Sequence, residues 1–405
     1  MGIFRVRGGI PLFGKVRVSG SKNAALPVLF ASIATRGVSE IDGLPDISDV
    51  DCAIRILEHL GASVRRLRER TYVDTRELIY SPVPCELVRP LRASTYLLSS
   101  MLLRFGRAEL GEFGGCNFAP RPIDIHISSL LSHGATVGGD TLVAKKLVPS
   151  DFSLSKRSVG ATVNSLILAA GIKGVSVIRG CALEPHILTL IDYLNSAGAD
   201  IELSADVATV RGGELSSGRV RIGGDMIEAG SFLAMSAVTR GSVSVLGAVA
   251  DELSSFVTPF TEAGMAYSGG FSVSLSGIPH RRVDITTAPY PGFPTDLQPV
   301  AAPLLSFSGG SLTDTVWQGR FGYLKELSRL GIRSRIVDGK AEIFPSEPRC
   351  AEVVAPDLRG GMALMIAALA ADGESVIHSG ELLLRGYERL VEKLAQLGAE
   401  IEYEK

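Results

Sequence analysis

Two kinds of apolar segment alternate along the chain, and both have the periodicity of helices. One kind is apolar on every side, as in ALPVLFASIA at 25–34 and ALMIAALAA at 363–371. The other kind has a charged face, as in YERLVEKLAQLG at 387–398. A helix that is apolar all round should be buried, whereas an amphipathic helix covers a core with one face. The pattern therefore predicts buried central helices that are ringed by sheet and by amphipathic outer helices.

The predicted elements alternate between helix and strand, which is typical of an α/β protein. Helices are expected at 23–35, 50–60, 93–104, 125–132, 161–170, 187–197, 229–239, 256–263, 297–305, 323–330, 361–371 and 386–397. Short strand-like segments, many of them bounded by glycine, lie at 15–19, 39–41, 62–64, 71–73, 142–144, 176–179, 208–211, 242–246, 271–275 and 342–344.

A glycine ends the amphipathic helix at a nearly constant interval. These glycines are Gly61, Gly134, Gly198, Gly264, Gly331 and Gly398, with spacings of 73, 64, 66, 67 and 67 residues. A second series follows the apolar helices at Gly37, Gly106, Gly174, Gly241, Gly309 and Gly373. A constant period indicates one supersecondary unit that is repeated. We therefore expect six units in two domains of three, at 22–225 and at 226–405, with 1–21 completing the second domain.

Composition restricts the class of protein. The chain has 405 residues, 46% of them hydrophobic and 21% charged, and a formal net charge of −2. This balance argues against a nucleic-acid partner. No apolar run approaches 18 residues and the N-terminus lacks an apolar leader, so we expect no membrane partner. Five scattered cysteines without CxxC spacing favour reduced thiols, a cytoplasmic location and no metal site.

The segment SGSKNAALP, at 19–27, combines a possible helix cap at Ser21 with Lys22 and Asn23 in the first turn. A lysine there adds to the free N–H groups and the positive dipole end that attract an anion. The alternative is a capped core helix with an exposed lysine.

The segment FGGCNFAPRPIDIHI, at 113–127, places Cys116 in a glycine-rich loop ahead of Arg121. A nearby cation favours the thiolate form of a cysteine. Asp124 and His126 add polar groups, while the alternative is a surface loop with a buried cysteine. The remaining cysteines, at 52, 85, 181 and 350, are assigned to packing.

Two further segments carry chemistry. In PYPGFPTDLQP, at 289–299, the prolines hold Asp296 rigidly near a helix start, where it is either a general base or a helix N-cap. Arg359 in DLRGG and Arg385 in LLRGYER flank two helix starts, and their guanidinium groups suit phosphate or carboxylate ligands. Either arginine alone is more often part of a surface ion pair.

In combination these segments resemble the enolpyruvyl transferase family over nearly the whole chain. The resemblance is carried by SGSKNAALP, LRAS, GGCNFAPRPIDIHI, KRSVGATV, EPHI, IEAGSFL, APYPGFPTDLQ, GRF, PDLR and RGYER. It implies two inside-out α/β domains of three units each, with a catalytic cleft between them and no cofactor. It also implies that the enolpyruvyl group moves from phosphoenolpyruvate to the 3′-hydroxyl of UDP-N-acetylglucosamine, as in peptidoglycan precursor synthesis.

The resemblance assigns roles to individual positions. Phosphoenolpyruvate would be held by cationic side chains, which are Lys22, Arg92, Arg121, Arg359 and Arg385. Cys116 matches the general acid that fosfomycin alkylates, Asp296 the base at the sugar hydroxyl, and Asp357 a carboxylate of proton transfer. The nucleotide would lie along Arg121, Pro122, Asp124 and Ile125 and along Lys156, Ser158, Val159 and Gly160. Asn23, Thr295 and Val316 match positions near the N-acetylglucosamine.

Four positions depart from the family pattern, and they leave the acceptor open. They are Leu183, His186, Met226 and Gln318, where the family usually has charged residues. The substitutions are either compensating losses in one ion network or a change of acceptor, for instance to UMP in nucleoside-antibiotic synthesis. A nucleotide-binding relative without catalysis is a third reading, against which Lys22, Cys116, Asp296 and Arg385 argue together.

Overall fold

The computed structural model describes residues 2–111, 113–114 and 122–405. Their contacts divide the chain into two compact units. The terminal unit contains Gly224–Lys405 together with the N-terminal segment through Ser19, and the inserted unit contains the described residues between Gly20 and Gly223. The domain ranges that we expect from the sequence stay a prediction.

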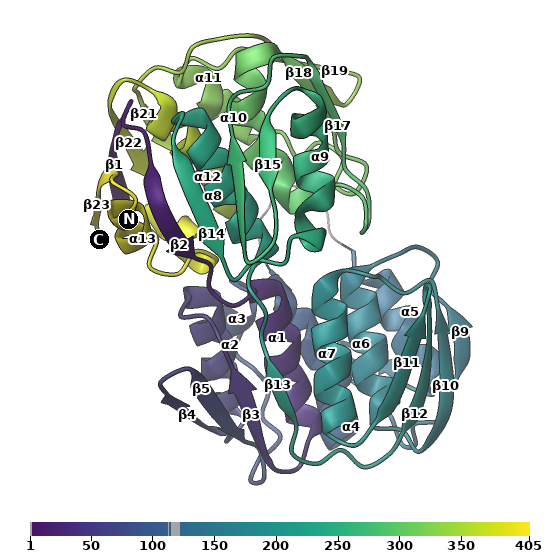
Figure 1. The fold of residues 1–405 in the computed structure, drawn as a ribbon. Coiled ribbons are helices and arrows are strands. Elements are labelled where there is room, and N and C mark those ends of the chain that lie inside the picture. The colour runs from purple at the N-terminus through teal and green to yellow at the C-terminus, as the bar shows by residue number, and fades with distance from the viewer. Residues whose placement is uncertain (1, 112, 115–121) are drawn as a thin grey trace. The chain divides into compact units, whose positions relative to one another are not determined.

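The inserted unit alternates helices with short strands (Figure 1). Its helices are α1 (Lys22–Ala31), η1 (Ser32–Ala34), α2 (Ser48–His59), α3 (Cys85–Val88), η2 (Arg92–Tyr96), α4 (Leu97–Phe105), α5 (Asp124–Ser132), α6 (Val159–Ala170) and α7 (Pro185–Ser196). Its strands are β3 (Val38–Asp42), β4 (Ser63–Leu67), β5 (Arg70–Asp74), β6 (Arg107–Glu109), β7 (Thr136–Gly138), β8 (Thr141–Val143), β9 (Asp151–Ser153), β10 (Gly174–Arg179), β11 (Asp200–Ser204), β12 (Val207–Gly212) and β13 (Arg219–Arg221).

The terminal unit is built in the same way. Its helices are α8 (Met226–Val238), η3 (Asp251–Leu253), α9 (Ser254–Glu262), η4 (Thr295–Leu297), α10 (Gln298–Ser308), α11 (Tyr323–Arg329), α12 (Leu358–Ala370), η5 (Gly380–Arg385) and α13 (Leu390–Gln396). Its strands are β1 (Ile3–Gly8), β2 (Phe13–Arg17), β14 (Ser242–Leu246), β15 (Ala266–Ser268), β16 (Ser272–Ser276), β17 (Val283–Thr286), β18 (Gly310–Thr313), β19 (Ser334–Val337), β20 (Lys340–Ile343), β21 (Glu352–Val354), β22 (Gly373–His378) and β23 (Glu400–Glu404).

The sheets repeat one topology. In β17-β18-β20-β19 and β13-β3-β5-β4 the first pair is parallel and the other two pairs are antiparallel. The sheets β11-β12-β10-β9 and β15-β16-β14-β2 have the same pattern when they are read from the other end, with the parallel pair last. In β21-β22-β1-β23 the N-terminal β1 lies antiparallel to both β22 and β23 (Figure 1). The sheet of β6, β8 and β7 has only the antiparallel part among the described residues. The repeated unit is therefore strand–helix–strand–helix–hairpin, which confirms the expected α/β fold class.

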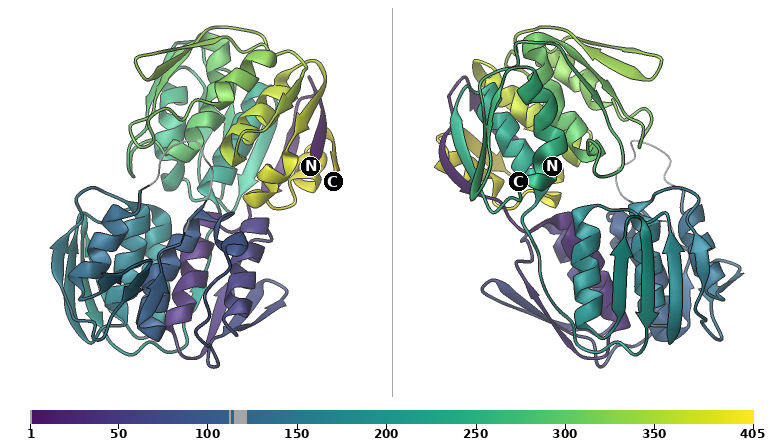
Figure 2. Two further views of the ribbon diagram at one scale, coloured as in Figure 1. Left: turned by 180° about the vertical axis from the view of Figure 1, so that it is seen from behind. Right: turned by 45° about the vertical axis from the view of Figure 1, so that its right-hand side comes forward.

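The apolar helices are the buried ones, as their composition predicts. In α6 every residue from Ala161 to Ala170 is buried, and in α12 every residue from Leu358 to Leu369 is buried. In the terminal unit α8, α10 and α12 pack on one another and form its centre. Sheets and amphipathic helices cover them, and Figure 2 shows the corresponding layers of the inserted unit, with β9–β12 over its helices.

The six glycines that end the amphipathic helices share one backbone conformation. All have φ between +84° and +119°, a region that favours residues without a Cβ atom. The chain then turns directly into a strand, as at Gly61 before β4 and Gly398 before β23. The repeat seen in the sequence is thus a repeated helix C-terminus, where glycine is the residue expected.

Three expectations need correction. The helix expected at 386–397 begins only at Leu390, because Arg389 has a positive φ of 49° and Gly386 is not helical. Many short strands were not expected, among them β6, β7, β9, β13 and β21 with three residues each, because such segments show no clear alternation. Packing does not describe Cys85 and Cys350, which are exposed, although Cys52 and Cys181 are buried.

No described helix is both long and apolar enough to cross a membrane.

Candidate active site

In the inserted unit, Lys22 is the first residue of α1 and forms a close ion pair with Asp49. Its Nζ lies 2.5 Å from Oδ2 of Asp49 in the first turn of α2, and the side chains are only 12% and 5% exposed. The alternative of an exposed lysine is therefore wrong. Ser21 occupies the N-cap position but caps with its main chain, since its side chain accepts no cap hydrogen bond. Asn23 follows in the first turn, as expected.

The two segments expected to bind the nucleotide begin neighbouring helices. Pro122 precedes α5, which begins at Asp124, and Ser158 caps α6 by accepting a hydrogen bond from the main chain of Ala161. The helices contact each other first near His126 and Gly160 and one turn later between Ser129 and Ser165. They therefore run in the same direction.

This parallel arrangement brings the two N-termini together. Free N–H groups and the positive dipole ends of two helices suit an anion such as a diphosphate. The expected residues at these ends are Pro122, Asp124 and Ile125 and then Lys156, Ser158, Val159 and Gly160, and of these Ile125 is buried whereas Lys156 and Asp124 are exposed. A Cβ atom on Gly160 would lie 2.3 Å from Nε2 of His126, so the close contact depends on this glycine.

Arg92 begins η2, a short helix that contacts both α1 and α6. Its half-buried side chain thus starts from an element that packs between α1 and α6. Cys116 and Arg121 lie outside the residues that the structure describes.

In the terminal unit, Asp296 is held between two buried arginines. Arg320 Nη1 donates to Oδ1 at 2.9 Å, and Arg359 donates to Oδ2 from Nε at 3.2 Å and from Nη2 at 3.1 Å. The arginine side chains are 5% and 4% exposed, whereas that of Asp296 is 30% exposed. The N-cap alternative for Asp296 is wrong, because η4 is capped at Pro294 and α10 at Leu297.

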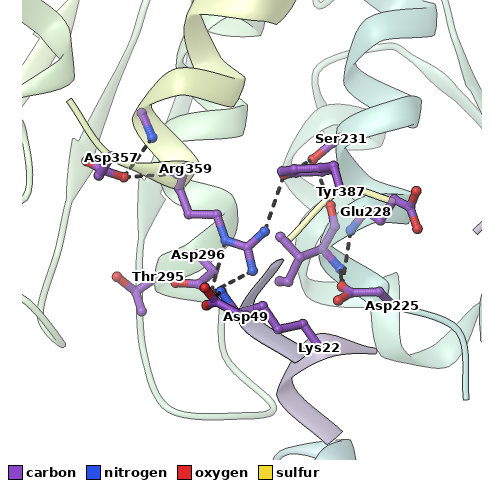
Figure 3. Close-up of polar contacts among 12 residues, drawn as sticks. Lys22, Asp49, Asp225, Glu228, Ser231, Thr295, Asp296, Asp357, Arg359 and Tyr387 are labelled. Carbon is purple, nitrogen blue, oxygen red and sulfur yellow. Dashed lines mark hydrogen bonds and ion pairs between the residues drawn. The ribbon is translucent and has the colours of Figure 1, made fainter. Parts of the chain in front are cut away.

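Arg359 is the centre of a wider buried network (Figure 3). Its side chain extends from α12 toward Asp296 and toward Tyr387, whose hydroxyl lies 3.4 Å from Nη1 and 2.8 Å from Oγ of Ser231. Burial lowers the pKa of Arg359, but Asp296, Tyr387 and Asp225 together more than offset this effect, and the pKa lies above its usual value. Arg359 is therefore a permanent buried cation, and the alternative of a surface ion pair is wrong for it.

Asp357 caps the helix that carries Arg359. Its Oδ1 accepts hydrogen bonds from the main-chain N–H groups of Arg359 and Gly360, both at 2.9 Å. Arg385 ends η5 and is half-buried. Thr295 and Val316 both donate hydrogen bonds to the buried carboxylate of Asp314. The hydroxyl of Thr295 lies 2.6 Å from Oδ2, and the main-chain nitrogen of Val316 lies 3.0 Å from Oδ1.

A second buried cluster lies where α8 begins. Glu228 accepts hydrogen bonds from Lys393 Nζ at 2.5 Å and from the main-chain N–H of Ser19 at 2.7 Å, while Asp225 caps α8. Burial raises the pKa of Glu228 to about 7, although Lys393 and Ser19 act in the opposite direction. No group of possible metal ligands is found among the described residues.

The residues that depart from the family pattern are on separate elements. Leu183 lies two residues before α7 and His186 is its second residue, both in the inserted unit, and Met226 begins α8 in the terminal unit. Gln318 is exposed in the loop before α11.

Four structural partners were not expected from the sequence. Asp49 is an acidic residue in the first turn of a helix, which is common, and Asp314 belongs to none of the motifs. Tyr387 lies in RGYER, which contributed to the resemblance without a role for the tyrosine. Arg320 lies in the segment GRF, which contributed to the resemblance without a role.

The α/β units suit an enzyme that acts on anionic substrates, because the inserted unit has a largely buried lysine and the terminal unit has two buried arginines beside a fixed carboxylate. The family model described as EPSP synthase (3-phosphoshikimate 1-carboxyvinyltransferase) matches residues 6–394. The chain therefore belongs to this family, the enolpyruvyl transferases.

Several members resemble the chain over its full length. UDP-N-acetylglucosamine 1-carboxyvinyltransferase of Halothermothrix orenii is 38% identical over 412 residues, which cover 99% of each chain. The enzyme named UDP-N-acetylglucosamine 1-carboxyvinyltransferase 1 of Streptococcus agalactiae is 38% identical over 98% of each chain. The crystal structure of the enolpyruvyl transferase NikO from Streptomyces tendae has 25% identity and a TM-score of 0.88, covering 100% of this chain and 99% of NikO.

Proposed function

We propose that the chain transfers the enolpyruvyl group of phosphoenolpyruvate to the 3′-hydroxyl of UDP-N-acetylglucosamine and releases phosphate. The observation that carries the proposal is the 38% identity over 99% of the chain to an enzyme with that name. The product would be a peptidoglycan precursor. The described cysteines form no disulfide, which supports a cytoplasmic location.

The reaction would proceed by addition and elimination. The oxygen of the acceptor hydroxyl attacks C2 of phosphoenolpyruvate, the hydroxyl proton passes to a base, and C3 takes a proton from an acid. In the tetrahedral intermediate C2 then carries both the sugar oxygen and the phosphate. Loss of a proton from C3 restores the double bond as the C2–O bond to phosphate breaks.

The described residues fit these steps. Asp296 is the base in the proposal, and Arg320 and Arg359 fix the direction of its carboxylate before the acceptor arrives. Preorganised charge of this kind needs no rearrangement during the reaction. Lys22, Arg92, Arg359 and Arg385, with Arg121, are the cations proposed to bind phosphoenolpyruvate. Cys116 is the proposed acid at C3.

Asp357 is the carboxylate proposed for proton transfer, and its Oδ1 already accepts two main-chain hydrogen bonds. Among the described residues Oδ2 accepts none, so this oxygen is the one assigned to proton transfer. The proposed position of the nucleotide is at the paired N-termini of α5 and α6, and the contacts between these helices support it because they put Asp124 and Gly160 at the same end of the pair.

A second acceptor is favoured by the high structural similarity to NikO, with its TM-score of 0.88. In this alternative the chain enolpyruvylates another uridine nucleotide such as UMP. The paired helix N-termini suit the phosphate of either nucleotide. The uncharged Leu183 and Met226 would then mark the change of acceptor.

The test is phosphate release from phosphoenolpyruvate with UDP-N-acetylglucosamine and, in parallel, with UMP. Release with the amino sugar nucleotide and not with UMP supports the first proposal, and the reverse result supports the second. If neither nucleotide leads to phosphate release, both acceptors are excluded. The matched control is Asp296→Asn, which keeps the shape of the side chain and removes the base. Loss of phosphate release in this variant would show that the phosphate is released by the chain's own catalysis.

Fosfomycin provides an independent test of the role of Cys116. Mass spectrometry should find one alkylated thiol, at Cys116, in an otherwise intact chain. Cys85 and Cys350 are exposed and serve as internal controls for unselective reaction. Equal labelling at all three cysteines would contradict the role assigned to Cys116.

A further inference from the structure

The hydroxyl group of Tyr387 lies between a side chain of α12 and a side chain of α8 (Figure 3). Tyr387 is 1% exposed, and its hydroxyl lies 3.4 Å from Nη1 of Arg359 and 2.8 Å from Oγ of Ser231. Oγ of Ser231 lies in turn 2.8 Å from the main-chain oxygen of Ile227. These four groups form one chain of hydrogen bonds.

Each hydrogen bond in this chain has a fixed direction. The main-chain oxygen of Ile227 can only accept, so the single proton of the Ser231 hydroxyl is used there. Tyr387 must then donate its own proton to Ser231, and its oxygen is left to accept from Arg359, which can only donate. Burial raises the pKa of the Tyr387 hydroxyl, although Arg359 and Ser231 act in the opposite direction. Ser231 thus turns the tyrosine oxygen toward Arg359.

Tyr387 completes the fixing of the Arg359 guanidinium group. Nε and Nη2 both donate to Oδ2 of Asp296 and so hold one edge of the planar group, while Nη1 donates to Tyr387. Cζ of Arg359 also lies 5.7 Å from the centroid of the Tyr387 ring, within the range of a cation–π interaction. A guanidinium group has five N–H donors, and these contacts use three of them. Among the described residues one N–H on each terminal nitrogen therefore stays available to an anionic ligand.

The backbone around Tyr387 is shaped to place its side chain. Arg389 has a φ of 49°, a left-handed conformation that is unfavourable for a residue with a Cβ atom. Such conformations are found most often at functional positions. Arg385, a proposed ligand of phosphoenolpyruvate, lies only two residues before Tyr387. The segment that carries Arg385 is thus attached to Arg359 through the tyrosine.

We propose that Tyr387 and Ser231 are positioning residues for the binding of phosphoenolpyruvate, a role that rests on the proposed function. Tyr387 holds the guanidinium group of Arg359 so that its remaining N–H groups keep one direction before the anion arrives. Ser231 acts only through Tyr387, because it fixes the direction of the tyrosine hydroxyl.

The experiment measures phosphate release by the full chain and by the variants Tyr387→Phe, Ser231→Ala and the double variant. Tyr387→Phe keeps the ring and removes the hydroxyl. We expect it to raise the KM for phosphoenolpyruvate about tenfold, the scale of one hydrogen bond to a charged group. The acceptor KM and kcat should stay within about twofold, because Nε and Nη2 of Arg359 still hold Asp296.

Ser231→Ala tests the direction of the hydroxyl. Tyr387 keeps its oxygen in this variant but no longer has an acceptor for its proton, so the KM for phosphoenolpyruvate should rise only about threefold. In the double variant this KM should be no higher than in Tyr387→Phe, because Ser231 then has no hydroxyl left to orient. Two independent structural defects would instead multiply.

The matched control is Tyr193→Phe. Tyr193 is fully buried in the inserted unit, and its hydroxyl lies 2.7 Å from Oγ of Ser39. Loss of this hydroxyl should lower the melting temperature about as much as Tyr387→Phe does. Both KM values and kcat should stay unchanged, so the control separates lost stability from lost positioning.

The proposal is overturned if Tyr387→Phe lowers only the melting temperature, as in the control, or if the acceptor KM rises as much as that of phosphoenolpyruvate. It is also overturned if the effects of Tyr387→Phe and Ser231→Ala multiply in the double variant. If Tyr387→Phe does not fold, Ser231→Ala decides, since an unchanged KM for phosphoenolpyruvate contradicts the proposal and a threefold rise supports it.

The proposed function itself fails if the wild type releases no phosphate with either UDP-N-acetylglucosamine or UMP. Calorimetric binding of phosphoenolpyruvate to the full chain then replaces turnover. Tyr387→Phe must weaken this binding about tenfold for the positioning role to stand. If the wild type does not bind phosphoenolpyruvate, the positioning role is overturned as well.

Discussion

The buried Glu228 should make the stability of the chain depend on pH, and Glu228→Gln should remove that dependence. The carboxyl is 2% exposed and lies between Lys393 and the main chain of Ser19. Glutamine has nearly the same shape but carries no charge, and its single oxygen can accept only one of the two hydrogen bonds, which end on different carboxylate oxygens. The lost hydrogen bond changes the stability by an amount that does not depend on pH, so the pH dependence reports the titration of Glu228 alone.

The sign follows from the pKa of Glu228, which burial raises from 4.5 to about 7 in the folded chain. Between these values the folded state binds the proton more tightly than the unfolded state, so the free energy of unfolding falls as pH rises. At ~1.4 kcal/mol for each pH unit between the two values, the decline is about 3 kcal/mol. It is absent below pH 4.5 and complete just above pH 7.

Urea unfolding of the wild type and of Glu228→Gln, followed by circular dichroism from pH 4.5 to 8, measures this decline. The difference between the two curves should grow by about 3 kcal/mol in favour of the variant over this range. Burial and Asp225 raise the pKa of Glu252 to about 7 as well, so Glu252→Gln should remove a separate decline of the same sign. Parallel curves for wild type and Glu228→Gln would refute the reasoning.

Three other predictions concern single positions. Lys22→Met should lower phosphate release at least about 100-fold, because a preorganised cation is lost, and the change in melting temperature should be too small to explain this loss. An equal loss of activity in the control Lys340→Met, at an exposed lysine, would contradict the prediction. Gly160→Ala should raise the nucleotide KM, because its Cβ would lie 2.3 Å from His126 Nε2, and the added change His126→Ala should restore it if this contact is the cause. Gly398→Ala should lower the free energy of unfolding by about 1 kcal/mol, because Gly398 has a φ of +96° although no atom lies near the place of the new Cβ. At Gly213 the place of the new Cβ is also empty but φ is not positive, so Gly213→Ala should leave the free energy of unfolding unchanged.

The repeat was predictable because it depends on local chemistry. A glycine at a helix C-terminus and an apolar helix of small residues are both readable from neighbouring positions, and α6 and α12 are buried as their composition indicates. The start of α13 was not predictable in the same way. The helical periodicity continues through 386–389, yet Tyr387 is buried against Ser231 and Arg359, and the backbone leaves helical geometry to place it there.

The candidate site, too, was only partly predictable from local sequence. The resemblance names Lys22, Asp296 and Arg359 one at a time, but the partners that orient them come from distant segments. Asp49 lies 27 residues beyond Lys22, and Arg359 lies 63 residues beyond Asp296. Such pairings arise from tertiary packing, which no local pattern specifies.

The position of β1 has a consequence for synthesis on the ribosome. This strand is made long before its partners β22 and β23, which begin at Gly373 and Glu400. At roughly 5–20 residues per second, β1 waits on the order of tens of seconds for them, while the whole inserted unit is translated in between. Nascent chains stalled before residue 373 should therefore keep β1 accessible to protease. During this time β1 has unpaired strand edges to which a chaperone could bind.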